Sequence, residues 1–174
     1  MAKWTSDAMH SEAQFKVKHL MVSTVTGHFE QFNASMDADK EDFTDAAIQF
    51  EADINSINTK NEQRDQHLKS DDFFNAEQYP KMVFQSSNLE KVNNTDYKLH
   101  GNLTIRDVTL PVVLDVEYGG ITTDAYGRTI AGFELQGKIK RKDFGLKWNA
   151  TTEAGGVVVS DEVKIQANIE MVKQ

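Results

Sequence analysis

Apolar and polar residues alternate with a period of two along most of the chain. In residues 11–20, Ala13, Phe15, Val17 and His19 share one parity, while glutamine and lysine take the other. Eight segments show this alternation: residues 11–20, 27–36, 46–57, 81–89, 96–105, 110–118, 128–140 and 157–171. Alternation of this kind is typical of strands that bury one face. The chain is therefore predicted to be all-β, with eight antiparallel strands.

Short turn-forming stretches separate several of these strands. Asparagine, aspartate or glycine supplies the turn chemistry at residues 93–94, 119–120, 124–127 and 155–156. Connections this short join neighbouring antiparallel strands, because parallel strands need a long crossover. The turns therefore agree with an antiparallel sheet.

The longest segment without strand alternation spans about residues 59–80. Its first half predicts a short helix, with Thr59 as N-cap and Glu62 three residues later. Phe73, Phe74 and Tyr79 follow in an acidic and irregular stretch. Two interpretations stay open: the rings anchor this crossover by packing on the end of the sheet, or they form the lid of an apolar cavity.

Eight strands with one apolar face each can form a sandwich or a closed barrel, and closure removes exposed strand edges. Small residues interrupt the large apolar side chains on the predicted inner faces, at Ser11, Ala13, Ala34, Ala46, Ala52, Gly101, Ala131, Gly137 and Ala167. This mixture is compatible with a filled interior and with a hollow one. The chain shows no repeat or linker, so residues 1–174 are predicted to form a single domain.

Composition narrows the functional classes. The net charge of −8 disfavours a general nucleic-acid role, and the lack of cysteine excludes disulfides and thiolate metal sites. No stretch approaches the roughly 18 apolar residues of a membrane helix. The first residues lack the basic and apolar regions of a signal peptide. The expected location is therefore cytoplasmic for the chain as it stands, and extracytoplasmic if a leader has been removed.

Motifs that carry chemistry are missing from the sequence. None of the five histidines stands in H-x-H or H-E-x-x-H, and neither G-x-S-x-G nor a glycine-rich phosphate loop occurs. No catalytic residue, metal ligand or cofactor is therefore predicted. His19 shares the parity of apolar residues, which favours a hydrogen-bonded core histidine over a polar group in a pocket.

Several blocks occur in an order that resembles a known family. They are MHSEAQFKVKHL, GHFEQFNASM, INSINTKNEQRDQHLKSDDFFNAEQYPKMVFQS, HGNLTIRDVTLPVVLDV, AGFELQGKIKRKDFGL and VSDEVKIQANIE, and they span nearly the whole chain. This order resembles the YceI-like family, which is known for lipid or polyisoprenoid binding. The resemblance implies an eight-stranded, lipocalin-like antiparallel barrel with a long apolar tunnel. Such a tunnel takes an isoprenoid or another extended lipid, such as a quinone tail.

Strand parity and the aromatic stretch supply a set of residues expected to line this tunnel. The set is Ala13, Phe15, Val17, His19, Phe32, Ile48, Phe50, Phe73, Phe74, Phe84, Leu99, Leu103, Leu114, Phe133, Leu135 and Ile165. Candidates for contact with a lipid head group are His19, Arg64, His67 and Arg141. Residues 106–107 and 141–143 are interpreted primarily as hairpin-turn residues.

The expected function is binding, sequestration or transport of a long apolar lipid without enzymatic activity. Polyisoprenoid, isoprenoid quinone and fatty-acid-like chains all fit such a tunnel. The expected partner is this lipid, with no nucleic acid and no metal, and self-association into a homodimer stays open. Two alternatives remain: a stress-related or scaffold protein without a ligand, and an enzyme acting on an apolar substrate. The enzyme would need an ionisable pair inside the barrel, for instance His19 with a carboxylate.

Overall fold

The computed structural model describes residues 2–149 and 158–174, which form one curved antiparallel sheet with short helical segments. The strands are β1 (Ala2–Ser6), β2 (Glu12–His19), β3 (Ser23–Phe29), β4 (Phe32–Ala38), β5 (Ala47–Asp53), β6 (Ile57–Asn58), β7 (Lys81–Lys91), β8 (Asp96–Ile105), β9 (Val108–Thr123), β10 (Thr129–Lys140) and β11 (Val159–Lys173). The helical segments are η1 (Ala8–His10), η2 (Ile54–Ser56), α1 (Glu62–Lys69) and η3 (Arg141–Phe144). None of the described helices is both long and apolar enough to cross a membrane.

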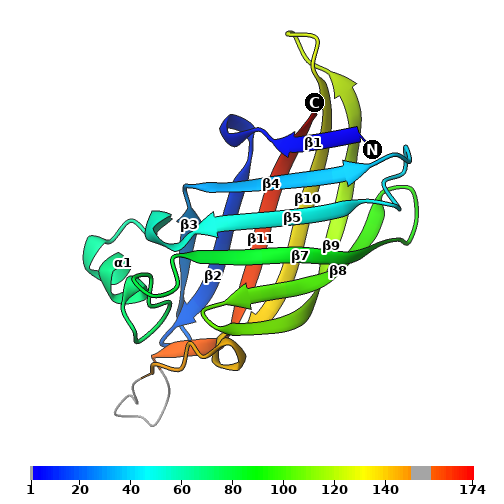
Figure 1. Ribbon diagram of the computed structural model, residues 1–174. Coiled ribbons are helices and arrows are strands. Elements are labelled where there is room, and N and C mark those ends of the chain that lie inside the picture. The colour runs from blue at the N-terminus through cyan, green and yellow to red at the C-terminus, as the bar shows by residue number, and fades with distance from the viewer. Residues whose placement is uncertain (1, 150–157) are drawn as a thin grey trace.

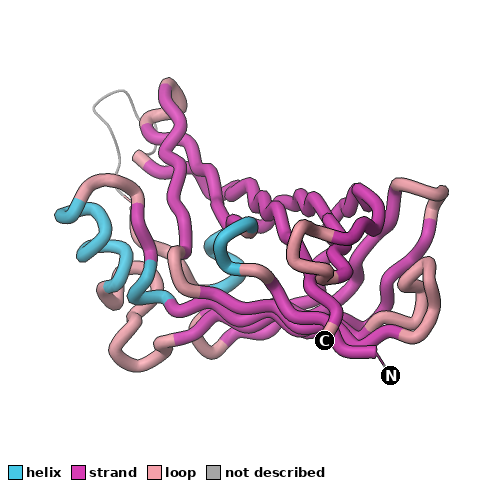
Figure 2. Tube along the Cα trace, turned by 90° about the horizontal axis from the view of Figure 1, so that it is seen from above, coloured by secondary structure: helices cyan, strands magenta, loops and turns pink. Residues whose placement is uncertain are grey.

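Eight of the strands close into a barrel, as predicted. The order is β1-β4-β5-β7-β8-β9-β10-β11, and β11 pairs with β1 to complete the ring. The remaining strands, β2, β3 and β6, extend the sheet from the other half of β11. Figures 1 and 2 show the strands curving around the interior, with α1 at one end. The eight-stranded antiparallel, lipocalin-like barrel is therefore confirmed.

The strands that form the ring differ from the predicted ones at the N-terminus. The sequence showed no strand at residues 2–6, yet β1 pairs with both β4 and β11. Asp7 then caps η1 by accepting a hydrogen bond from the Met9 N–H at 3.1 Å. The interruption lets β1 and β2 pair with successive parts of the same edge of β11. Alternation missed β1 because Trp4 is the only buried residue in its five positions.

The predicted turns have mixed outcomes. Residues 93–94 connect β7 to β8, and residues 124–127 connect β9 to β10, as predicted. The prediction at residues 119–120 is wrong, because they lie inside β9. There the pairing between β9 and β10 shifts register, and Gly120 adopts a φ of 106° that suits glycine. Residues 155–156 lie outside the described part of the chain.

The predicted helix is present, but its N-cap is not Thr59. Asn61 caps α1 through its side-chain oxygen, which accepts a hydrogen bond from the Arg64 N–H at 3.0 Å. Thr59 is buried and donates its N–H and hydroxyl to an Asp65 carboxylate oxygen, at 2.9 and 2.6 Å. Thr59 therefore fastens the connection from β6 to the first turn of the helix.

Large aromatic side chains pack directly over some of the small residues that face the interior. The Phe84 ring lies so close to Gly101 that a Cβ at this position would stand 2.4 Å from it. Phe15 covers Gly27 in the same way, at 2.2 Å from such a Cβ. Phe15 and Gly27 are direct partners in the β2–β3 ladder. Close approach of large rings therefore explains part of the alternation between small and large residues.

Candidate functional site

A cavity of about 400 Å3 occupies the barrel interior. Its walls come from nearly every strand and from the segment between α1 and β7. Inward residues such as Phe15, Leu114, Leu135 and Ile165 are only half-buried, although they face the interior. They border space that no side chain of the described residues fills. Of the two interiors compatible with the sequence, the structure has the hollow one, and its volume falls in the usual range of ligand pockets.

The structure places all but one of the residues predicted to line the tunnel on the cavity wall. These are Ala13, Phe15, Val17, His19, Ile48, Phe50, Phe73, Phe74, Phe84, Leu99, Leu103, Leu114, Phe133, Leu135 and Ile165. Phe32 does not line the cavity and instead packs against Phe50, with ring centroids 5.5 Å apart. Contact of these residues with a ligand stays a prediction.

Other wall residues escaped the sequence analysis for identifiable reasons. Met36, Val112 and Val116 lie on faces that the alternation had already marked as inward. Leu89 was missed because the β7–β8 register shifts between Ser86 and Asn88, which changes the inward parity of β7. Leu146 and Trp148 were missed because they lie in a segment without strand alternation. Val158 was missed because its parity is opposite to that of Val163 and Ile165 in the predicted strand.

One end of the cavity is closed by a compact group of aromatic rings. Phe43, from the connection between β4 and β5, is 2% exposed and contacts three rings edge-on. Its centroid lies 5.4 Å from Trp4, 5.5 Å from Tyr118 and 5.5 Å from Phe133. The Tyr97 hydroxyl donates to the Asp42 carbonyl at 2.9 Å, and burial raises the pKa of this phenol. This group seals the barrel with protein atoms.

The opposite end is covered by the aromatic stretch that follows α1. Arg106, in the β8–β9 turn, donates hydrogen bonds to the carbonyls of Asp71 and Phe73 at 3.0 and 2.9 Å. The Phe73 ring packs 5.5 Å from Trp148, and both rings line the cavity. Phe74 also lines it. The two interpretations of the aromatic stretch therefore hold together, since these rings anchor the crossover and border the interior.

The polar residues of the cavity wall gather mainly at this second end. His67 hydrogen-bonds Asp72 at 2.9 Å and packs edge-on against Trp148, with centroids 4.8 Å apart. Arg64 donates to the Thr59 hydroxyl and carbonyl at 2.8 and 2.7 Å. His19 is exposed at the end of β2, so its interpretation as a core histidine is wrong.

Arg141 is a structural residue at the same end. It is 3% exposed, and its guanidinium donates to the carbonyls of Leu146, Trp148, Val159 and Ser160 at 2.6 to 3.1 Å. Burial lowers the pKa of this group. The prediction that residues 141–143 serve a hairpin turn is wrong, because they form η3. The corresponding prediction for residues 106–107 is confirmed by their place between β8 and β9.

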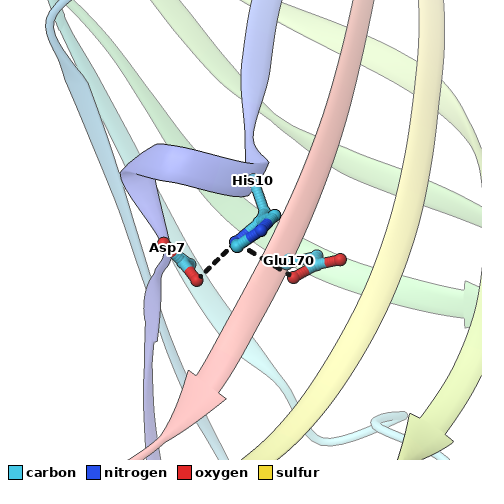
Figure 3. A group of neighbouring side chains, drawn as sticks. All are labelled: Asp7, His10 and Glu170. Carbon is cyan, nitrogen blue, oxygen red and sulfur yellow. Dashed lines mark hydrogen bonds and ion pairs between the residues drawn. The ribbon is translucent and has the colours of Figure 1, made fainter. Parts of the chain in front are cut away.

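A polar group outside the cavity joins η1 to β11 (Figure 3). His10 Nδ1 lies 3.0 Å from an Asp7 carboxylate oxygen and 3.9 Å from a Glu170 oxygen. The hydrogen bond between His10 and Asp7 raises the pKa of the imidazole and lowers that of the carboxyl. Arg128 approaches the same Asp7 oxygen at 3.4 Å. These residues could surround a cation, but the arginine and imidazole already balance the carboxylates.

A profile of the YceI-like domain matches residues 4–171. The chain belongs to the YceI-like family. A UPF0312 protein of Staphylococcus aureus strain N315 is 37% identical over 171 residues, which cover 98% of this chain and 97% of that protein. A Campylobacter jejuni YceI protein of known structure is 36% identical, with a TM-score of 0.77 over 90% of both chains.

Two more distant structures share the fold of this YceI-like protein. BcnA from Burkholderia cenocepacia is 22% identical, with a TM-score of 0.83 over 95% of this chain and 98% of that one. A polyisoprenoid binding domain from Saccharophagus degradans is 16% identical, with a TM-score of 0.71 over 98% of both chains. At these identities the likeness concerns the architecture of the barrel.

Proposed function

We propose that this YceI-like protein binds a long apolar lipid in the barrel and sequesters or carries it without changing it chemically. The observation that carries the proposal is the cavity of about 400 Å3, whose walls are predominantly aliphatic and aromatic. A polyisoprenoid, an isoprenoid quinone or a fatty-acid-like chain matches such walls. The polyisoprenoid binding domain of Saccharophagus degradans has the same barrel, which supports this class of ligand.

Apolar burial supplies the binding free energy. Each buried CH2 group contributes about 0.8 kcal/mol, so a five-carbon isoprene unit contributes on the order of 3 kcal/mol before losses in chain entropy. Walls of this kind discriminate poorly between chains of different chemistry. We therefore assign selectivity to chain length and to the polar residues at the second end, His19, Arg64 and His67, which face a lipid head group.

The composition of the wall favours a binding protein over an enzyme. Among the described residues that line the cavity, none carries a hydroxyl or a carboxyl group. His67 pairs with Asp72, which lies outside this lining. A hydrolase that uses the activated hydroxyl of a side chain would need this nucleophile within hydrogen-bond reach of its base. The chemistry of this wall therefore suits the binding of a lipid chain without its chemical conversion.

Two adjacent residues of β9 offer a matched test. Val112 lines the cavity, whereas Val113 is exposed on the outer face. We expect organic extracts of the purified protein, examined by mass spectrometry, to contain a stoichiometric lipid. V112W should reduce this lipid at least about tenfold because the indole occupies the cavity. V113W should retain it. A protein free of lipid, or equal loading of the two folded variants, would contradict the proposal.

A further inference from the structure

The turn between β2 and β3 exposes three consecutive apolar residues. Leu20 is 42% exposed, Met21 62% and Val22 83%. Single exposed apolar residues are common on protein surfaces, but contiguous ones often mark an interaction site. The three side chains occupy the whole connection between the paired residues His19 and Ser23. They form the outermost part of this hairpin, which we call the apolar tip (Leu20, Met21, Val22).

The backbone of the apolar tip is unfavourable for the residues that it carries. Leu20 and Met21 have φ angles of 52° and 59°, a region that favours glycine and asparagine. Phe43 has a similar φ of 61°, but its ring is buried among aromatic neighbours that offset the strain. Leu20 and Met21 are exposed, so burial of their side chains does not offset the strain in the same way. Strain of this kind is characteristic of functional positions.

The apolar tip borders the second end of the cavity. His19 and Lys18, which precede it, line the cavity, and the Leu20 N–H donates to the carbonyl of Val158, another lining residue, at 2.8 Å. Figure 1 shows the end of β2 beside the start of β11 and η3. A surface that contacts the three side chains of the apolar tip would therefore lie next to the polar end of the cavity.

The charge around the apolar tip is opposite to that of the whole chain. Residues 13–29 contain no aspartate or glutamate but include Lys16, Lys18 and two histidines, whereas the chain carries a net charge of −8. Acidic residues of the adjoining part of β11 are engaged locally. Asp161 accepts from the Lys142 N–H at 3.1 Å, and Glu162 lies 3.8 Å from the Lys138 ammonium. Exposed apolar residues flanked by lysine suit an anionic lipid surface.

We infer that the apolar tip docks the barrel onto an anionic lipid bilayer, with the polar end of the cavity facing the membrane. The inference rests on the proposed function, because docking places the cavity where a lipid chain can pass between bilayer and barrel. The tip enters the boundary between head groups and acyl chains, and Lys16 and Lys18 lie near the anionic head groups.

The test uses sedimentation with vesicles made of equal amounts of phosphatidylcholine and phosphatidylglycerol. The wild-type protein should bind these vesicles and bind vesicles of phosphatidylcholine alone more weakly. L20N/M21G/V22S should lower the affinity at least about tenfold, because three apolar side chains are removed from the contact. Its thermal stability should not fall, since Asn-Gly suits positive φ. V92S, which removes an exposed apolar residue from the turn at the opposite end of the barrel, should bind like wild type.

Several outcomes would overturn the docking inference. They are a lack of vesicle binding by wild type, equal binding by the tip variant, and equal binding to both kinds of vesicle. Sedimentation velocity without vesicles supplies another such outcome. If wild type is a dimer, the tip variant is a monomer and neither binds vesicles, the apolar tip is an interface between two copies of the protein.

The docking inference and the proposed function can fail separately. V112W, whose substitution points into the cavity, should lose extractable lipid but still bind vesicles through the intact tip. Wild type that carries lipid but ignores vesicles would overturn docking alone. Wild type that binds vesicles through the tip but never contains lipid would overturn the proposed function alone.

Discussion

The two ends of the barrel are closed by aromatic residues in different ways. At one end, Phe43 is enclosed by Trp4, Tyr118 and Phe133, and the nearby Tyr97 hydroxyl is satisfied by a backbone carbonyl. At the other end, aromatic rings of the stretch after α1 line the cavity beside arginine and histidine side chains. The first arrangement resembles a protein core, and the second resembles the rim of a binding site. Similar residue types therefore serve stability at one end and access at the other.

The largest expected effect comes from the sealed end. Phe43→Ala should reduce the free energy of unfolding by about 3 to 5 kcal/mol, because a fully buried ring is lost and its neighbours cannot fill the space. Denaturation by urea measures this loss. Phe74→Ala, at the cavity rim, should cost clearly less, since this ring is only half-buried. Equal losses for the two variants would contradict the distinction between the ends.

A smaller effect is expected where Arg106 holds the aromatic stretch. Arg106→Ala removes hydrogen bonds to Asp71 and Phe73 and should reduce the free energy of unfolding by about 1 to 3 kcal/mol. Hydrogen exchange of residues 70–79 should accelerate more than exchange in β4 and β5. Lys98→Ala is a suitable control, because its ion pair with Asp115 is exposed on the outer wall. Unchanged exchange in residues 70–79 would show that Arg106 does not hold this stretch.

The smallest effect concerns pH and the Asp7–His10 pair outside the cavity. The raised pKa of His10 implies a stabilisation that is present below its ordinary value of 6.5 and is lost as pH rises through the raised value. The lowered pKa of Asp7 implies a stabilisation that is present above 3.8 and is lost as pH falls through the lowered value. The stability difference between wild type and His10→Ala should therefore be largest between these limits. Thermal unfolding at several pH values measures it, and a difference independent of pH would contradict the pairing.

Much of the barrel could be predicted from strand alternation, because each wall strand has a dry or cavity-facing side and a wet side. Phe15, Leu114 and Ile165 were placed correctly on this basis. Leu89 could not be placed, since the irregular pairing of β7 with β8 changes the inward parity. Trp148 and Leu146 carry no periodic signal, so their approach to the cavity depends on the tertiary fold alone.

The second end of the cavity, with its polar residues, was harder to predict from the sequence than the cavity wall. Alternation put His19 in the core, but β2 ends there and leaves the imidazole exposed. Arg141 looked like a turn residue, whereas the fold surrounds it with backbone carbonyls from segments up to 19 positions away. Contacts of this kind depend on how chain ends and connections meet, and local sequence patterns do not encode them.

The most direct test of a lipid-binding barrel is the electron density inside it. Crystals should be grown from protein purified without detergent or added lipid. We predict continuous, elongated density along the walls formed by Phe15, Leu114 and Leu135, ending at the ring of Phe133, which borders the cavity at the sealed end. An interior without such density, or one filled by inward side chains of the protein itself, would contradict the account.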